Sequence, residues 1–141
     1  NLMVVWGSGG TLRMIGDLLN QELTLLGIDI QHDDKIYADL NEEQLIEILQ
    51  QHTGNKILLL SPMGGQGFLI GRGNLQLSPA VLRLIGISSV LGVATPAKLT
   101  GLSNVRIDTG DSDLDQEFRE RKFVKMLQGY RTTRVIRVSD V

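Results

Sequence analysis

Apolar runs of strand length alternate with amphipathic segments of helical period along the whole chain. Glycine, proline and other turn-forming residues separate these segments. The segments expected to be strands are Leu2–Trp6, Leu23–Ile30 (continued past a turn at Asp33-Asp34 by Lys35–Ala38), Lys56–Ser61, Ser89–Ala94, Asn104–Asp108, Phe123–Leu127 and Thr133–Val138.

Helical periodicity and capping signals predict helices in the longer intervals between these strands. Residues 11–19 place Leu12, Ile15, Leu18 and Leu19 on one face of the first helix. The expected N-caps of the later helices are Asn41, Ser78, Thr95 and either Asp111 or Ser112. Asn41 has a glutamine three residues on, which is typical of a capping box, and Ser78 and Thr95 are each followed by proline at the first helical position.

Alternation of strands and helices with short turns predicts an α/β fold. The expected architecture has three layers, with a mostly parallel sheet, helices on both of its faces and an antiparallel closing pair formed by the last two strands. Residues 1–141 are expected to form a single domain. Because the chain enters an apolar strand directly at Asn1, we expect it to be the C-terminal fragment of a longer protein whose N-terminal lobe is absent.

Composition excludes several classes of protein. The chain has no cysteine, so it cannot form a disulfide framework or use a thiol nucleophile. With 14 Lys and Arg against 16 Asp and Glu, the net charge of −2 argues against a nucleic-acid partner. No apolar run approaches the roughly 20 residues of a membrane span and no signal peptide is visible, so we expect no membrane partner and a cytoplasmic location.

Half of the sixteen glycines fall in two short clusters that each follow an apolar run. The first cluster is Gly7-Ser8-Gly9-Gly10-Thr11, at the start of the first predicted helix. A strand-to-helix turn of this kind presents backbone N–H groups and the positive end of a helix dipole to a phosphate. Ordinary capping by Ser8 or Thr11 would explain the same residues, and the sequence leaves both interpretations open.

The larger cluster, between Gly64 and Asn74, is the expected main phosphate loop. It lies between Glu47 and Asp108 in a stretch without acidic residues, which favours an anion. Its spacing matches neither the Rossmann nor the P-loop fingerprint, but its glycines can turn N–H groups toward phosphate oxygens and Arg72 offers two donors. The alternative is a strained loop in which Arg72 pairs with a carboxylate. The candidate binding residues here are Gly64, Gly65, Gly67, Arg72, Gly73 and Asn74.

Other polar residues are weaker candidates. Within the acidic run at residues 108–115, Asp108 or Asp111 could orient a ribose hydroxyl or a magnesium ion, whereas a helix N-terminus complemented by negative charge is the alternative. His32 and His52 have no partner at useful spacing and are expected on the surface. The seven basic residues between Arg119 and Arg137 are expected to form a solvated face rather than a polyanion-binding patch.

The residues around the larger cluster carry a resemblance. The segment Pro62-Met63-Gly64-Gly65-Gln66-Gly67-Phe68, followed by Gly71-Arg72-Gly73-Asn74 and Ser78-Pro79, resembles the C-terminal domain of the ATP-NAD kinase-like family. The resembling branch comprises predicted ATP- or polyphosphate-dependent NAD kinases and includes the acetoin catabolism X proteins. Nearly the whole chain is covered, since three further segments agree: Thr24–Asp29, Ala94–Leu99 and Arg106–Asp111.

The resemblance implies a nucleotide-handling domain that works with an N-terminal lobe, with ATP or polyphosphate, NAD and Mg²⁺ as ligands. Thr95 is added to the candidate binding residues on this basis. In the family, a Gly-Gly-Asp-Gly-Thr motif in that lobe supplies the catalytic aspartate. This chain has no such motif, so we assign it no catalytic and no metal-binding residue and expect it to be inactive alone. The family's Asn-Glu pair has its letters at Asn41-Glu42, where helix capping explains them.

Two other functions stay open. The Gly-Ser-Gly-Gly-Thr turn is similar to the phosphate-binding turn of ribose-5-phosphate isomerase-like and CoA-transferase-like folds. The ligand would then be a sugar phosphate or an acyl-CoA, and a carboxylate near Asp108 would act as base. The third possibility is a non-catalytic regulatory or dimerising domain whose glycines serve packing. The protein is expected to be a homo-oligomer.

Overall fold

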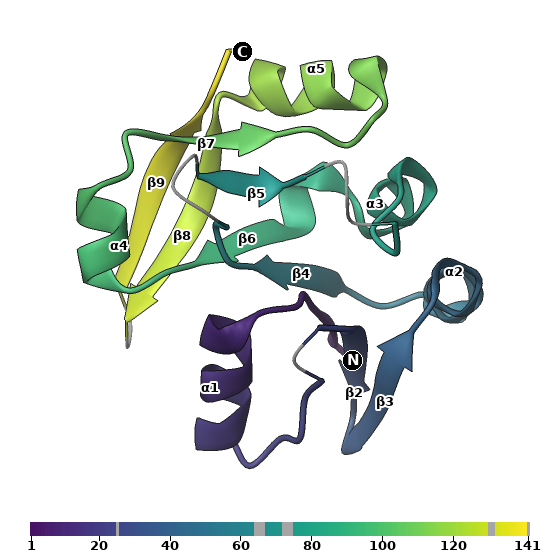
Figure 1. Ribbon diagram of the computed structural model, residues 1–141. Coiled ribbons are helices and arrows are strands. Elements are labelled where there is room, and N and C mark those ends of the chain that lie inside the picture. Colours follow the sequence, from purple (N-terminus) through teal and green to yellow (C-terminus); the bar gives the residue numbers. More distant parts are fainter. Residues whose placement is uncertain (25, 64–66, 72–74, 130–131, 141) are drawn as a thin grey trace.

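The computed structural model describes residues 1–24, 26–63, 67–71, 75–129 and 132–140. These residues form a sheet with the strand order β3-β2-β1-β4-β6-β8-β9-β7-β5. The sheet is strongly twisted, and helices flank it on several sides (Figure 1).

Four parallel strands make the centre of the sheet: β1 (Met3–Trp6), β4 (Lys56–Leu60), β6 (Val90–Val93) and β8 (Phe123–Gly129). The first three are nearly continuous apolar runs, because a strand covered on both faces buries both sets of its side chains. Alternation along the strands then divides these side chains between the faces. Val5 and Leu58 belong to the core on one face, and Trp6 and Leu59 to the core on the other.

An antiparallel hairpin extends this centre at one side. It consists of β2 (Ile28–His32) and β3 (Lys35–Leu40), and β2 pairs with β1. The predicted turn at Asp33-Asp34 is confirmed, with Asp33 at a positive φ of 56°. The predicted strand from Leu23 was too long at its start. Leu23 instead packs into the core beside the first helix, and the chain becomes extended only at Ile28.

The helices are α1 (Gly10–Leu18), α2 (Glu42–Gln51), α3 (Pro79–Ile85), α4 (Pro96–Thr100) and α5 (Ser112–Arg121), with a short 3₁₀ turn at Ile87–Ser89. The predicted capping box is confirmed, because the side chains of Asn41 and Gln44 each accept a hydrogen bond of 2.9 Å from the other residue's amide. The caps predicted for α3, α4 and α5 are also confirmed, at Ser78, Thr95 and Asp111.

The remaining strands are β5 (Phe68–Ile70), β7 (Asn104–Ile107) and β9 (Thr132–Val138). The closing pair β8–β9 is antiparallel as predicted, whereas β7 is parallel to β9 and β5 is parallel to β7. These three strands therefore run opposite to β1, β4, β6 and β8. Strand β5 was not predicted, because its three residues lie inside the larger glycine cluster.

Two apolar cores lie on opposite faces of the sheet. The larger one packs α2, α3, α4 and α5 against it through side chains such as Leu45, Leu82 and Phe118. The smaller one packs α1, through the fully buried Leu12, against Trp6 and neighbouring strands. The predicted α/β fold, with a mostly parallel sheet, helices on both faces and an antiparallel closing pair, is confirmed.

The reversal at β8–β9 has a consequence for any binding site. Strands β1, β4, β6 and β8 end where α1 and α4 begin, and we call this side of the sheet the α1–α4 edge. Strands β5 and β7 end on the opposite side, where the chain continues to α3 and α5, and we call it the α3–α5 edge (Figure 1). The carboxyl ends of parallel strands thus form two separate places at which a ligand can bind.

Candidate functional site

Three chain segments meet along the α1–α4 edge. The neighbouring strands β1, β4 and β6 end in the same direction, so the turn Gly7–Thr11, the residues after Leu60 and Thr95 follow one another along this edge. The amide of Gly7 donates a hydrogen bond of 2.9 Å to the carbonyl oxygen of Leu59. The structure therefore brings together the first predicted phosphate turn and Thr95.

The glycines of this turn serve different purposes. A Cβ atom at Gly7 would lie 2.7 Å from Leu60 Cδ2 and 2.9 Å from the Leu59 carbonyl oxygen, so only glycine lets the two strands end this close together. Gly9 has a φ of +122°, which L-residues rarely adopt. Open space surrounds the Cβ positions of Gly9 and Gly10. Gly7 is thus required by packing, Gly9 by its backbone conformation, and Gly10 by neither.

The N-terminus of α1 has no side-chain cap. Gly9 occupies the N-cap position, and neither Ser8 nor Thr11 caps the helix, so the alternative of ordinary hydroxyl capping is wrong. The first turn also contains no acidic residue. The first N–H groups of a helix lack intrahelical partners and carry the positive end of its dipole. This turn therefore has the local electrostatics that an anion requires.

An apolar groove of about 440 Å³ lies beside the turn, between α1 and α4, and we call it the α1–α4 groove. Among the described residues that line it, none is charged, and the polar ones are Thr11, Thr95 and Gln128. Thr11 belongs to both the turn and the groove. The aliphatic walls include Met14, Ile15 and Leu18 of α1 and Leu59, Val93 and Leu127 of the sheet.

Most of the larger glycine cluster lies outside the described residues, namely Gly64, Gly65, Arg72, Gly73 and Asn74. Their roles stay predictions. Gly67 is described: it is buried at the start of β5 with a φ of +72°, and its carbonyl accepts a hydrogen bond of 3.0 Å from the Arg106 amide. A Cβ atom there would lie 2.8 Å from Leu102 Cδ2. Gly67 therefore positions β5 at the α1–α4 edge.

Asp108 and Asp111 lie on the opposite side of the sheet. They follow β7 at the α3–α5 edge, where the Asp108 amide donates a hydrogen bond of 2.9 Å to the carbonyl of Ile70 at the end of β5. Gly71 follows that residue on the same side. The structure therefore does not bring Asp108 or Asp111 together with the turn Gly7–Thr11 or with Thr95.

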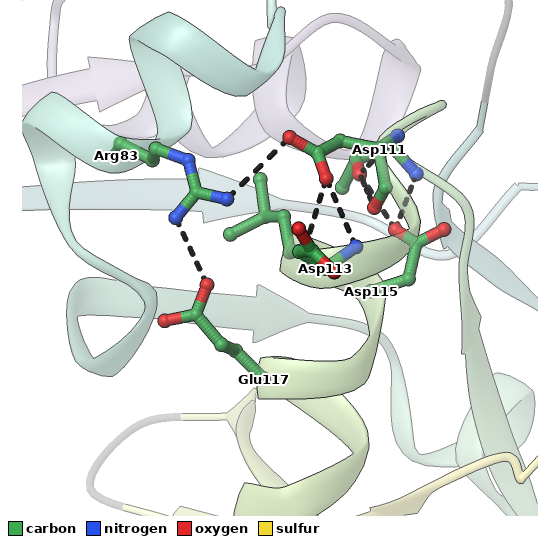
Figure 2. A network of polar contacts seen from close by, with 7 residues as sticks. Arg83, Asp111, Asp113, Asp115 and Glu117 are labelled. Atoms are coloured by element: carbon green, nitrogen blue, oxygen red, sulfur yellow. Dashed lines mark hydrogen bonds and ion pairs between the residues drawn. The ribbon is translucent and has the colours of Figure 1, made fainter.

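The Asp111 carboxylate is engaged in local structure (Figure 2). Its Oδ1 accepts hydrogen bonds from the amides of Asp113, at 2.9 Å, and Leu114, at 3.2 Å. Its Oδ2 lies 3.4 Å from Nη2 of Arg83, whose Nη1 binds Glu117 at 2.9 Å. The bond from the Leu114 amide is the largest of the contacts that hold the pKa of Asp111 below its ordinary value. The alternative prediction, a helix N-terminus complemented by negative charge, is confirmed at Asp111.

Asp115 ties the same helix to the end of β7. Its carboxylate is buried, and Oδ1 accepts hydrogen bonds from the amide of Thr109, at 2.8 Å, and from its hydroxyl, at 2.6 Å. Asp108 Oδ1 accepts a bond of 3.2 Å from the Gly110 amide. The acidic run thus builds the junction between β7 and α5.

The profile of the family described as ATP-NAD kinase C-terminal domain matches residues 7–138. The match begins at the first glycine turn and ends with β9, so it spans α1 to α5. The chain belongs to this family. The finding agrees with the resemblance seen around Gly64–Pro79. No curated protein and no solved structure matches the chain.

The ATP-NAD kinase C-terminal domain offers no magnesium centre in its described part. No three His, Asp or Glu side chains there come together in a way that could hold a metal ion. Asp111 and Asp115 use their carboxylate oxygens for helix capping and for Thr109. The described residues therefore contain no site that would hold Mg²⁺ through protein side chains alone. In the same part of the chain, no helix is long and apolar enough to cross a membrane.

Asp29 is a polar residue of this domain that the sequence did not single out. Its carboxylate is almost fully buried beside the α1–α4 edge and accepts three hydrogen bonds. They come from the Thr24 amide and hydroxyl, both at 2.6 Å, and from the Asp39 amide at 2.7 Å. Asp29 thereby holds the segment before β2 against the end of β3. The sequence did contain a signal for this buried carboxylate, because Asp29 stands between Ile28 and Ile30 of a predicted strand.

The prediction of two unpartnered surface histidines was wrong. The rings of His32 and His52 meet edge to face with their centroids 4.7 Å apart, and His52 is buried. Their Nε2 atoms lie 2.9 Å from Asn1 Oδ1 and 3.1 Å from the Asn55 carbonyl oxygen, respectively. The pair forms only when β2 and the end of α2 meet beside β1, which spacing in the sequence does not reveal.

The basic residues near the C-terminus are mostly exposed, in keeping with the expected solvated face. Arg137 forms an ion pair of 3.6 Å with Asp140. The exposed members are Arg121, Lys122, Lys125, Arg134 and Arg137, and Arg131 lies outside the described residues.

Proposed function

We propose that this ATP-NAD kinase C-terminal domain binds the phosphates of a nucleotide, or of another phosphorylated ligand, at the α1–α4 edge. The observation that carries the proposal is the start of α1. This helix begins at the carboxyl end of a parallel strand, without a side-chain cap and without an acidic residue in its first turn. Ligands of open α/β sheets bind at such positions. Membership of the family supports ATP, NAD or polyphosphate as the ligand.

In this proposal Gly7 positions the turn against Leu59, and the four residues after it contact the phosphates. Gly9 and Gly10 expose backbone N–H groups, and the hydroxyls of Ser8 and Thr11 donate further hydrogen bonds to phosphate oxygens. Thr95, which lies in the loop after β6, donates a hydrogen bond from its hydroxyl at the same edge. Gly64, Gly65 and Gly67, which follow β4 in the chain, are proposed to supply a second set of donors at this edge. Arg72, Gly73 and Asn74 follow Gly71, which lies at the α3–α5 edge, and are not assigned to this site. Asp108 and Asp111 are left out, because they lie at the opposite edge and Asp111 caps α5.

Phosphoryl transfer would need groups that this chain does not supply. The sequence lacks the Gly-Gly-Asp-Gly-Thr motif, and the described residues contain no group of three His, Asp or Glu side chains that could hold a metal ion. We therefore propose that residues 1–141 form one ligand-binding domain and that an N-terminal lobe provides the catalytic aspartate. The 141-residue chain alone should form no NADP from NAD with ATP or polyphosphate. Formation of NADP by this chain would contradict the proposal.

The phosphate turn can be tested by placing a carboxylate beside it. Gly10 is exposed at the first position of α1 and has open space around it. Gly10→Asp should leave the fold intact, or stabilise α1 through its dipole, while repelling an anion. Binding of tripolyphosphate, measured by isothermal titration calorimetry, should be lost in Gly10→Asp and kept in the matched control Gly10→Ala. Equal binding by both variants would refute the turn as the phosphate site.

The alternatives make different demands on the same structure. In the sugar-phosphate isomerase or CoA-transferase alternative, the same turn would hold the phosphate, but a base near Asp108 would lie at the wrong edge of the sheet. The packing alternative agrees with Gly7 and Gly67, whose Cβ positions are occupied by neighbours. It does not explain the open surroundings of Gly9 and Gly10. If none of ATP, NAD, tripolyphosphate, sugar phosphates and CoA stabilises the chain, the packing alternative is favoured. The oligomeric state of the protein stays a prediction.

A further inference from the structure

We propose that the α1–α4 groove binds the adenine ring of the nucleotide whose phosphates contact the turn Gly7–Thr11. This inference rests on the proposed function, because it takes the phosphorylated ligand to be a nucleotide. It adds the place where the base lies and the residue that recognises it.

The groove lies directly beside the proposed phosphate turn. Thr11 lies both in the turn and in the lining of the groove, and Thr95 and Pro96 line the groove from the start of α4. A ligand with its phosphates at the start of α1 therefore has the groove directly beside it. The volume of about 440 Å³ falls within the range of ligand-binding pockets.

The walls of the groove are aliphatic. One wall is formed by Met14, Ile15 and Leu18 of α1, and the other by side chains at the carboxyl ends of β4, β6 and β8. Met14 and Leu18 are 53% and 78% exposed, so their apolar surface is not covered by other described parts of the chain. Two aliphatic walls suit the faces of a flat ring, and they offer nothing to a charged group.

Gln128 supplies the polar contact that a nucleobase needs. It lies near the end of β8 in the lining of the groove, and no other described residue forms a hydrogen bond with its side chain. A carboxamide presents a donor and an acceptor side by side, which matches N7 and the amino group of adenine. Guanine presents two acceptors at the same edge and matches only half of this pair. The groove should therefore prefer adenine.

ATP and NAD share the adenosine group, so the experiment must separate the base from the phosphates and one ligand from the other. Calorimetric titration of the 141-residue chain with tripolyphosphate, adenosine, ATP, GTP, NAD and nicotinamide mononucleotide does this. We expect ATP to bind roughly tenfold more tightly than tripolyphosphate and than GTP, as one paired base edge provides. Tighter binding of NAD than of nicotinamide mononucleotide would extend the same site to NAD. Equal binding of these two would limit the site to ATP.

Two variants test the groove itself. Gln128→Glu removes the donor of the carboxamide, and Met14→Gln places a polar group in the apolar wall. Both should weaken adenosine and ATP binding about tenfold while leaving tripolyphosphate binding unchanged. The matched controls are Gln116→Glu on the exposed face of α5 and Leu2→Gln, whose side chain is 47% exposed outside the groove. Neither control should change any affinity.

The outcomes separate this inference from the proposed function. Binding of tripolyphosphate as tight as that of ATP, with no binding of adenosine, would overturn the adenine site and leave the phosphate turn standing. Adenosine binding that is lost in both groove variants, without any binding of tripolyphosphate, would support the groove and refute the phosphate turn. Adenosine binding that survives in both variants would also overturn the inference.

Discussion

The amide of Gly7 donates a hydrogen bond of 2.9 Å to the carbonyl oxygen of Leu59, and this bond fixes the first glycine turn against the end of β4. The same pair of residues sets a steric limit, because a Cβ atom at Gly7 would lie 2.9 Å from that oxygen. A backbone atom cannot rotate away as the end of a flexible side chain can. The position of the turn at the α1–α4 edge therefore depends on glycine at this position.

Substitution of Gly7 by alanine should destabilise the domain. The new methyl group would press against Leu59 and Leu60, and overpacking of this kind costs about 1–3 kcal/mol. The matched control is Gly10→Ala, which adds the same methyl group in open space at the first position of α1 and should stabilise the domain by about 0.4–1 kcal/mol. Urea unfolding measures both values. Equal stability of the two variants would show that the close approach at Gly7 is relieved at little cost.

Helix starts were predictable because their signals are local. The capping box at Asn41, the serine-proline and threonine-proline starts of α3 and α4 and the cap at Asp111 depend on residues within three positions of each other. Strand direction depends on partners that are far apart in sequence. The pairing of β7 with β9 places Asp108 at a different edge from Gly7, and no local pattern reports that separation.

The buried carboxylate of Asp29 should be among the most sensitive positions of the domain. Asp29→Ala would leave the partly buried amide bonds of Thr24 and Asp39 without their acceptor, which costs up to about 1–3 kcal/mol for each group. Asp29→Asn keeps one acceptor oxygen and should lose about half as much stability. Thermal and urea unfolding show whether Asp29→Ala loses more stability than Asp29→Asn. A loss no larger in Asp29→Ala than in Asp29→Asn would mean that water replaces the missing acceptor.

Acid should weaken the start of α5 through Asp111. The amide bonds from Leu114 and Asp113 and the contact with Arg83 lower the pKa of Asp111 below its ordinary value of 3.8 in the folded chain. A lowered folded pKa means that this stabilisation is fully present above about 3.8 and is lost as the pH falls through the folded pKa. The variant Asp111→Ala should therefore unfold at a lower temperature than the parent chain at neutral pH, and the gap should close in strong acid.

The matched control for this pH dependence is Asp113→Ala, since Asp113 is exposed in the same helical turn and only its amide contacts Asp111. At neutral pH, the unfolding temperature of Asp113→Ala should lie closer to that of the parent chain than the unfolding temperature of Asp111→Ala does. Unfolding temperatures recorded from neutral pH to strong acid give both curves. A gap for Asp111→Ala that stays constant down to strong acid would contradict a stabilising role of the ionised carboxylate.

The apolar face of the first helix was predictable, but its burial was predictable only in part. Leu12 was expected on the inner face of the first helix, and the structure buries it completely. The apolar period of this segment also placed Ile15 and Leu18 on the same face, yet Leu18 is 78% exposed. The end of that face borders the α1–α4 groove instead of the core. Periodicity reports the apolar face of a helix but not how much of it a partner covers.

Attachment of α1 to the sheet should depend on Leu12 and much less on Leu18. Leu12→Ala empties a fully buried position in the core that contains Trp6 and Leu59 and should cost about 2–5 kcal/mol. Leu18→Ala at an exposed position should change stability by less than about 0.5 kcal/mol. Trp6 belongs to the same core and is the single tryptophan, so its fluorescence reports the loosening of α1 directly. Because the phosphate turn is the start of this helix, Leu12→Ala should also weaken tripolyphosphate binding under conditions in which the domain is still folded. Unchanged binding in a folded Leu12→Ala chain would show that the turn keeps its shape without the packing of α1.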